Sequence, residues 1–195
     1  GRRRMKRALV TGAGGFVGSH LVKYLKARGY WVRGVDLKVP EWEPSAADEF
    51  LRLDLRRADS MARAYGTLGV DEVYALAADM GGMGFIETHK AECMLSVLIN
   101  THLLMAAREA GIERFFYASS ACVYNADKQT DANVTALKES DAYPAMPEDG
   151  YGWEKLFSER MCRHFTEDFG LVTRVARFHN VYGPHGTWAG GREKA

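Results

Sequence analysis

The sequence predicts an α/β fold built on a doubly wound parallel sheet. Short apolar runs alternate along the chain with segments whose apolar residues recur at helical spacing. A glycine-rich turn joins the first apolar run to the first helical segment, which is typical of a strand–turn–helix unit. No repeat and no low-complexity linker interrupts this order, and 195 residues are enough for one large domain with a substantial core.

Six strands and three long helices follow from these patterns. The strands are predicted at Arg7–Thr11, Trp31–Asp36, Phe50–Asp54, Glu72–Ala77, Arg114–Ser119 and Leu171–Arg177. The helices are predicted at Phe16–Ala27, at about His89–Ala110 and at Gly150–Phe169. A glycine follows each predicted helix within two residues, as is common where helices end. The long polar segment Asn125–Asp149 lies between a strand and a helix, and we expect it to be a functional surface loop.

Composition excludes several classes of protein. Lys and Arg total 26 and Asp and Glu total 25, so the net charge of +1 gives no electrostatic reason to expect nucleic acid or membrane as a partner. We find no apolar stretch long enough to span a membrane and no signal-peptide core. Cys93, Cys122 and Cys162 are too few for a disulfide framework and indicate a reducing, cytoplasmic setting. The six histidines show no metal-binding spacing, so no catalytic metal is predicted.

Basic residues cluster at the amino terminus. We interpret residues 1–6 as a basic leader that is solvated in front of the first strand. A nucleic-acid-binding arm and a targeting signal are the alternatives.

The glycine turn predicts a site for a dinucleotide of the kind found in Rossmann folds. Its glycines follow the spacing Gly12-x-x-Gly15-x-x-Gly18 between a strand and a helix. Gly12 permits the tight turn, Gly15 lets the main chain approach a pyrophosphate, and Gly18 allows close packing of helix on strand. The start of the helix, at Phe16 and Val17, offers free N–H groups and the positive end of the helix dipole to phosphates.

An acidic residue at the end of the second strand indicates which dinucleotide is bound. Asp36 lies 18 residues after Gly18, where a carboxylate can bind both ribose hydroxyls of NAD and repel the extra phosphate of NADP. NAD is therefore the predicted cofactor. Four further residues at strand ends are expected to line the site, near the adenine or as small residues that leave room for the cofactor: Asp54, Leu55, Ala77 and Ala78.

A tyrosine and a lysine one helical turn apart predict proton-transfer chemistry. Tyr151 and Lys155 are at i and i+4, on one face of the predicted helix. An ammonium beside a phenol favours the phenolate, so we expect Lys155 to lower the pKa of Tyr151 and let it take a proton from an alcohol. Ser119 and Ser120, at the end of the fifth strand, are placed to hydrogen-bond the same oxygen.

Together these motifs resemble the extended short-chain dehydrogenase/reductases, and within them the GDP-mannose 3,5-epimerase family. The more specific segments are Leu76–Phe85 (LAADMGGMGF), Phe115–Tyr124 (FFYASSACVY) and Arg177–Pro184 (RFHNVYGP), with Gly190–Ala195 (GGREKA) at the end. The resemblance covers nearly the whole chain after residue 6. It implies transient oxidation at C4 of a GDP-hexose by bound NAD, proton exchange at C3 and C5, and re-reduction of the C4 ketone by the NADH formed in the first step.

The resemblance also implies roles for individual residues. Tyr151 would be the redox base with Lys155 as its partner, Ser120 a ligand of the C4 oxygen, and Cys122 and Lys194 the pair that exchanges protons. The substrate-binding residues would be Gly81, Gly82, Met83, Ser120, Cys122, Asn180, Glu193 and Lys194. Cys93 and Cys162 lie in helical patterns and are predicted to be packing residues. Family members pair through two helices, so a homodimer of the full-length protein is expected.

Two departures and two alternatives accompany this interpretation. Asn125 stands where the family usually has proline, and Gly150 stands where alanine is common. We interpret residues 7–195 as an NAD-binding domain from which the carboxy-terminal substrate-binding part is missing, because the glycine-rich end does not resemble a domain boundary. The alternatives are another NAD-dependent nucleotide-sugar epimerase, dehydratase or reductase, and a non-catalytic NAD-binding module.

Overall fold

The protein folds around one parallel sheet, and the computed structural model describes residues 3–78, 83–130 and 136–186. Six strands form the sheet in the order β3-β2-β1-β4-β5-β6, and every neighbouring pair is parallel. The strands are β1 (Arg7–Thr11), β2 (Trp31–Asp36), β3 (Glu49–Arg52), β4 (Glu72–Ala75), β5 (Arg114–Ser120) and β6 (Thr173–Phe178). The order reverses direction next to β1, so the doubly wound parallel sheet is confirmed.

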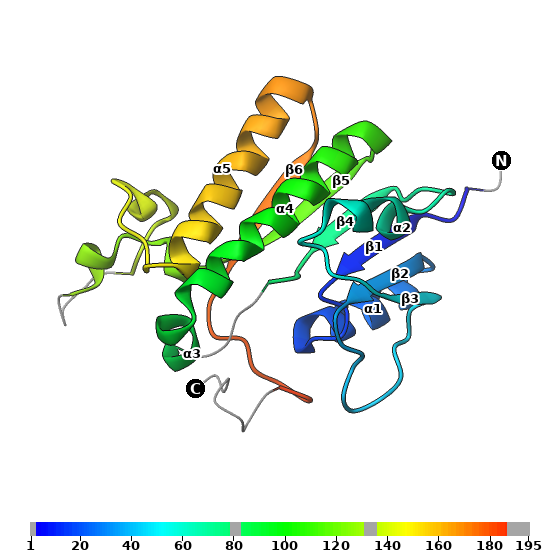
Figure 1. Ribbon diagram of the computed structural model, residues 1–195, viewed down its shortest axis with the longest axis horizontal. Coiled ribbons are helices and arrows are strands. Elements are labelled where there is room, and N and C mark those ends of the chain that lie inside the picture. The colour runs from blue at the N-terminus through cyan, green and yellow to red at the C-terminus, as the bar shows by residue number, and fades with distance from the viewer. Residues whose placement is uncertain (1–2, 79–82, 131–135, 187–195) are drawn as a thin grey trace.

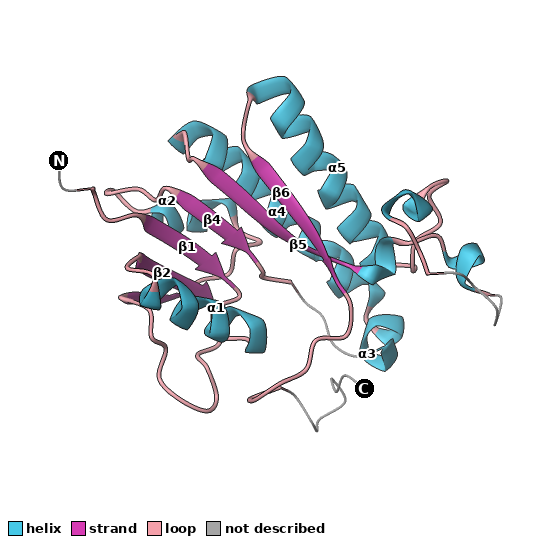
Figure 2. Ribbon diagram, turned by 180° about the vertical axis from the view of Figure 1, so that it is seen from behind, coloured by secondary structure: helices cyan, strands magenta, loops and turns pink. Residues whose placement is uncertain are grey.

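Helices cover both faces of the sheet. They are α1 (Phe16–Ala27), α2 (Met61–Tyr65), α3 (Met83–Thr88), α4 (Lys90–Ala110) and α5 (Tyr151–Phe169). Helix α1 packs on one face, while α4 and α5 lie side by side on the other (Figures 1 and 2). Short 3-10 helices occur at Ala58–Ser60, Ala121–Val123, Ala126–Gln129 and Glu139–Ala142.

Alternating side chains of the strands fill two separate cores. In β1, Leu9 packs into the core beneath α4 and α5, whereas Ala8 and Val10 pack into the core beneath α1. All three side chains are fully buried. Burial on both faces explains why the strands are almost continuously apolar in the sequence.

Several predicted strand bounds differ from those in the structure. Strand β4 ends at Ala75 rather than Ala77, because the N–H groups of Leu76 and Ala77 bond to the hydroxyl of Thr11, at 3.1 and 3.2 Å. Strand β3 starts one residue earlier than predicted and ends at Arg52, and β6 starts at Thr173 instead of Leu171.

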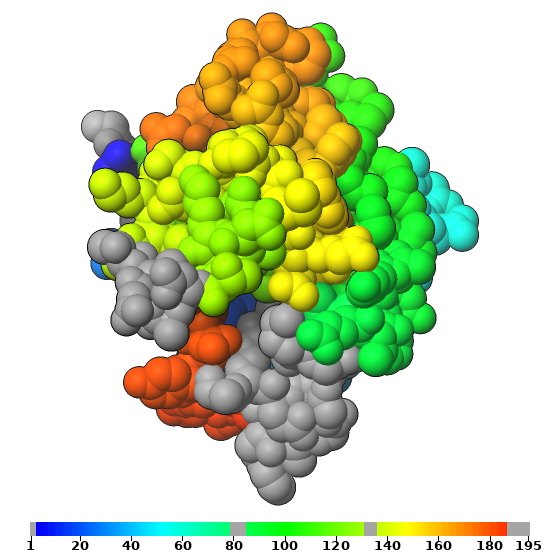
Figure 3. All heavy atoms as spheres, turned by 90° about the vertical axis from the view of Figure 1, so that its left-hand side faces the viewer, coloured from blue at the N-terminus to red at the C-terminus, as the bar shows by residue number. Residues whose placement is uncertain are grey.

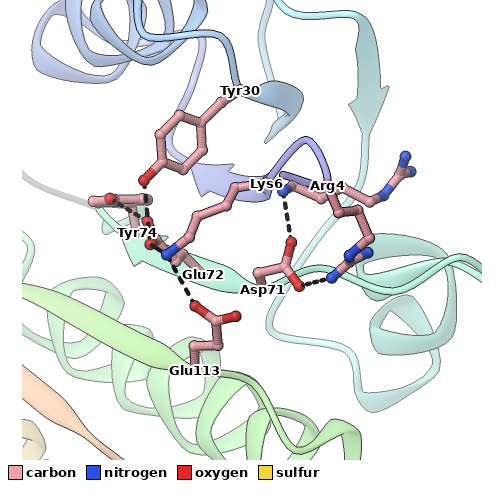
Figure 4. A network of polar contacts seen from close by, with 8 residues as sticks. Arg4, Lys6, Tyr30, Asp71, Glu72, Tyr74 and Glu113 are labelled. Carbon is pink, nitrogen blue, oxygen red and sulfur yellow. Dashed lines mark hydrogen bonds and ion pairs between the residues drawn. The ribbon is translucent and has the colours of Figure 1, made fainter. Parts of the chain in front are cut away.

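The basic leader contacts the amino edge of the sheet through Arg4 and Lys6. Arg4 pairs with Asp71 at 2.5 Å, and the ammonium of Lys6 lies 3.2 Å from Glu72 and 3.0 Å from Glu113 (Figure 4). Glu72 is only 2% exposed. Arg4 is 70% exposed and Lys6 is 31% exposed, so both keep contact with solvent while they pair with carboxylates of the sheet edge, and the solvated leader stays a prediction.

Candidate functional site

The glycine turn lies at the carboxyl edge of the sheet, between β1 and α1. Gly12 has a φ of +70°, and a Cβ there would lie 2.9 Å from the main chain of Leu76 and Ala77. A Cβ on Gly18 would lie 2.0 Å from the carbonyl oxygen of Gly12. Gly12 thus supports a tight turn, and Gly18 allows the helix to approach it, as their spacing predicted.

Gly14 has a structural role that the spacing pattern missed. A Cβ at this position would lie 1.9 Å from the carbonyl oxygen of Lys38, so only glycine fits. The N–H of Gly14 donates to Asp36 at 2.9 Å. Its neighbour Gly15 is less crowded, since a Cβ there would lie 3.3 Å from Gly12, and its predicted contact with a pyrophosphate stays a prediction.

Asp36 connects the end of β2 to the glycine turn. One carboxylate oxygen accepts the N–H of Gly14, and the other accepts the N–H of Leu37 at 2.7 Å. The side chain is only half-buried, so it remains accessible to a ligand at the carboxyl edge. This placement suits the predicted contact with a ribose.

A small surface hollow lies over the turn and the start of α1. Its lining residues include Gly14, Gly15, Phe16, Lys38, Trp42 and His185. Gly15 is the N-cap residue of α1 but makes no side-chain capping hydrogen bond, and no acidic residue occupies the first helical turn. The half-buried Phe16 and Val17 begin this helix, so the hollow opens on the positive end of the α1 dipole.

The four strand-end residues that were predicted to line the cofactor site lie in different environments. The carboxylate of Asp54 binds the guanidinium of Arg56 at 3.1 Å, and this hydrogen bond holds the pKa of Asp54 below its usual range. The side chain of Leu55 is 4% exposed and belongs to the core, so only its main chain is available to a ligand. Ala77 and Ala78 are half-buried just beyond β4.

Tyr151 and Ser120 meet where β5 ends and α5 begins. Tyr151 is the first residue of α5 and is 2% exposed. A hydrogen bond with Ser120 lowers the pKa of Tyr151, but the larger effect of burial raises that pKa above its ordinary value. Of the two serines predicted to bind this phenol, Ser120 does so. The prediction is wrong for Ser119, because its hydroxyl donates to Glu159 at 2.5 Å instead.

Lys155 lies one turn further along α5 and is also buried. Its ammonium donates to the carbonyl oxygen of Ala118 at 2.9 Å and lies 5.5 Å from the centre of the Tyr151 ring. Lys155 therefore does not bring the pKa of Tyr151 below its ordinary value, so the expected net lowering of that pKa is wrong for this arrangement. Desolvation of the buried phenol outweighs the other influences on it.

Cys122 lies beside the phenol of Tyr151 and is half-buried. Its N–H donates to the hydroxyl of Ser120 at 3.2 Å, and its side chain packs on a cluster that contains Tyr151, Ile86 and Cys93. Cys93 and Cys162 are fully buried, which confirms them as packing residues. Burial raises the pKa of the Cys162 thiol to about 12.

The remaining predicted substrate ligands are only partly covered by the structure. Met83 begins α3, and Asn180 is exposed two residues beyond β6. Gly81, Gly82, Glu193 and Lys194 lie outside the described residues. Their predicted roles stay predictions.

The two departures from the family pattern both have a structural explanation. Asn125 is 5% exposed, and its amide donates to Pro144 at 2.7 Å while its side-chain oxygen accepts the N–H of Asp127. It therefore ties together the polar segment, whose described parts form the surface beside the start of α5 (Figure 3). Gly150 has a φ of +77°, a conformation that favours glycine over alanine.

Two kinds of feature are absent from the described part of the chain. Among the described residues, no three His, Cys, Asp or Glu side chains are grouped so that they could hold a metal ion. None of the helices in the described part of the chain combines the length and apolar character needed to cross a membrane.

Comparisons with known proteins agree with this geometry. A model of the NAD dependent epimerase/dehydratase family matches residues 8–194. GDP-mannose 3,5-epimerase 1 of Oryza sativa subsp. japonica is 52% identical over 192 residues, covering 97% of this chain and 50% of the relative. GDP-mannose 3,5-epimerase of Arabidopsis thaliana is 50% identical over 189 residues, covering 95% of this chain and 50% of the relative. The chain thus spans about half the length of these curated relatives.

Solved structures share the fold. The UDP-glucose 4-epimerase of Thermotoga maritima with UDP-glucose has a TM-score of 0.81 and 26% identity, over 95% of this chain and 59% of that chain. The UDP-glucose 4-epimerase of Thermus thermophilus in complex with NAD has a TM-score of 0.78 and 29% identity, over 91% of this chain and 56% of that chain.

Proposed function

Because the chain belongs to the NAD dependent epimerase/dehydratase family, we propose that it binds NAD across the glycine turn. The close approach of α1 to the turn, which a Cβ on Gly18 would prevent, supports this proposal. The pyrophosphate would contact the start of α1, and Asp36 would bind the ribose. The likeness to a UDP-glucose 4-epimerase in complex with NAD is a second support.

We further propose that the full-length protein is a GDP-mannose 3,5-epimerase. The observation that carries this proposal is the convergence of Ser120, Cys122 and Tyr151 at the carboxyl edge of the sheet. Redox chemistry at C4 requires Tyr151 and Ser120, whereas only proton exchange on carbon requires a thiol such as Cys122. Identity of 50–52% to curated GDP-mannose 3,5-epimerases supports the choice of substrate.

Each of these side chains has a definite part in the proposed reaction. Tyr151 takes the proton of the C4 hydroxyl and later returns it, and Ser120 hydrogen-bonds the same oxygen. NAD, when bound, supplies the hydride acceptor and donor. Burial raises the pKa of Tyr151 and so favours the protonated phenol, which opposes the first of these two steps. Removal of the proton needs the phenolate, which the hydrogen bond from Ser120 and the nearby charge of Lys155 stabilise.

The ketone at C4 makes the protons on C3 and C5 acidic. Cys122 is proposed to exchange protons on one face of the sugar, with Lys194 as its counterpart on the other. The half-exposed position of Cys122 beside Tyr151 supports its role. Gly81, Gly82, Met83, Asn180 and Glu193 complete the proposed set of substrate ligands.

Isotope exchange distinguishes the proposed activity from the alternatives. The full-length protein is incubated with GDP-mannose in deuterated water, and deuterium is located by NMR. Label at C3 and C5 supports the 3,5-epimerase. Label or product elsewhere indicates another nucleotide-sugar enzyme, and its complete absence indicates a module that only binds NAD.

Variants assign the two steps to separate residues. Tyr151→Phe is expected to abolish turnover, because no group is left to move the C4 proton. Cys122→Ser is expected to abolish deuterium exchange while leaving NAD affinity unchanged. Cys162→Ala is the matched control, since this thiol is fully buried in the core away from the proposed site. Full exchange by Cys122→Ser would remove Cys122 from the mechanism.

We also propose that the protein is a cytoplasmic homodimer that pairs through α4 and α5. The two helices carry exposed apolar side chains: Met94, Leu95, Leu98 and Met105 on α4, and Trp153 and Phe157 on α5. An apolar surface of this kind is typical of a protein interface. Light scattering of the full-length protein should give a dimer, and Leu98→Glu should give a monomer. A monomeric wild type would contradict the proposal.

A further inference from the structure

We propose that Arg177 and Glu159 are positioning residues. They fix the 3-10 turn Ala121–Val123, which begins after Ser120 and contains Cys122. This inference rests on the proposed function, in which the side chains of Ser120 and Cys122 act on the sugar. Neither Arg177 nor Glu159 belongs to the proposed set of proton-transfer residues. Both side chains are largely shielded from solvent, at 16% and 12% exposed.

Arg177 holds Glu159 with a forked contact. Its Nη2 lies 2.9 Å from one carboxylate oxygen of Glu159, and its Nε lies 3.1 Å from the other. Two parallel contacts of this kind define the orientation of both groups, which a single ammonium could not do. Arg177 extends from β6 and Glu159 from α5, so the pair joins the sheet to the helix.

Glu159 in turn holds the residue next to Ser120. The hydroxyl of Ser119 donates to the carboxylate of Glu159 at 2.5 Å, and Ser119 is opposite Arg177 in the pairing of β5 with β6. Ser120 follows directly and binds Tyr151. A change in the Arg177–Glu159 pair therefore reaches Ser120 through one peptide unit.

The same guanidinium contacts the other end of the turn. Its central carbon lies 5.0 Å from the centre of the Tyr124 ring, and its Nη1 donates to the carbonyl oxygen of Glu139 at 2.7 Å. Tyr124 follows Cys122 by two residues. Arg177 thus contacts both sides of the 3-10 turn Ala121–Val123, and through Glu139 it also anchors the polar segment.

Displacement of this turn should reduce catalysis more than binding. A misplacement of about 1 Å can lower a rate about 100-fold, so Arg177→Gln is expected to reduce kcat about 10- to 100-fold with little change in KM. Arg177→Lys keeps the charge but loses the fork, and should recover part of kcat. Ser119→Ala, which leaves the ion pair intact, should show a smaller loss in the same direction and serves if Arg177→Gln does not fold.

Alkylation of Cys122 gives a readout that does not depend on activity. Of the three cysteines in this chain, iodoacetamide should modify Cys122 selectively, because Cys93 and Cys162 are fully buried. Arg177→Gln is expected to raise the alkylation rate several-fold, measured by peptide mass spectrometry. Arg163→Gln is the control. It removes an exposed ion pair between Arg163 and Glu167 within α5, the helix that carries Glu159, and should leave the alkylation rate unchanged.

The outcomes separate this proposal from the proposed function. If Arg177→Gln lowers only the melting temperature, and both kcat and the alkylation rate equal those of the wild type, the positioning role is refuted. If the wild type does not act on GDP-mannose, the proposed function fails. A several-fold change in the alkylation of Cys122 would still support the positioning role.

Discussion

Replacement of Gly18 by alanine tests the contact on which the proposed NAD site depends. The new Cβ would lie 2.0 Å from the carbonyl oxygen of Gly12 and 2.9 Å from the Cα of Ala13. Both are main-chain atoms, so no side-chain rotation relieves the overlap. Contacts below 3.0 Å essentially never occur, and α1 would have to move by about 1 Å relative to the turn.

The expected sign follows from two opposing effects. Overpacking typically costs about 1–3 kcal/mol, and a clash between main-chain atoms lies at the upper end. Alanine favours a helix over glycine by about 1 kcal/mol. The net loss should be about 2 kcal/mol, or about 4–8 °C in Tm for a domain of this size. The displaced turn should also bind NAD at least about tenfold more weakly, a change of about 1.4 kcal/mol.

Thermal unfolding and calorimetric titration with NAD measure the two effects. Gly69→Ala is the control, since Gly69 has a φ of +68° but no atom within 4 Å of the added Cβ. It should cost about 1 kcal/mol of stability through backbone strain alone and leave the NAD affinity unchanged. A Gly18→Ala protein that is more stable than the wild type and binds NAD normally would show that α1 and the turn are not in contact.

Three further substitutions test other parts of the structure. Asp36→Asn should weaken NAD binding about tenfold and reduce discrimination against NADP, because the ribose loses a charged acceptor; equal titrations of the wild type and the variant would contradict this. Glu72→Ala should cost about 3 kcal/mol, because Lys6 and two tyrosine hydroxyls lose their buried acceptor, whereas Glu113→Ala at the exposed end of the network should cost less than about 1 kcal/mol in chemical denaturation. Tyr65→Phe should lose about 1 kcal/mol with its hydrogen bond to a main-chain carbonyl of α4. Burial raises the pKa of Tyr65, so its contribution to stability is complete below pH about 10 and is lost as the pH rises further; the variant should show a shallower alkaline decline in Tm.

The first βαβ unit could be predicted from the sequence almost residue by residue. The bounds of β1, α1 and β2 agree with the prediction, because each is defined locally by apolar spacing or by glycine. Helix α2 has only five residues, too few to show a helical period, and it was missed. The end of β4 depends on the hydroxyl of Thr11, which lies more than sixty residues away in the sequence.

The candidate site was predicted as a set of residues but not as a set of contacts. The motif correctly selected Ser120 and Tyr151 as neighbours, yet it could not show that burial raises the pKa of Tyr151. Burial depends on how α4 and α5 pack together, and no local pattern contains that information. Gly14 was missed for a similar reason, since the carbonyl that excludes a side chain there belongs to the loop after β2.

The end of β5 explains how one helix can hold several of the proposed catalytic groups in register. Three consecutive residues of the strand each contact a different residue on α5: Ala118 contacts Lys155, Ser119 contacts Glu159, and Ser120 contacts Tyr151. The α5 residues are spaced four apart, so they form one stripe along the helix. Loss of a single contact leaves two others to keep the helix in place. The position of Tyr151 is therefore determined by the whole strand end, and substitutions along this stripe should affect catalysis non-additively.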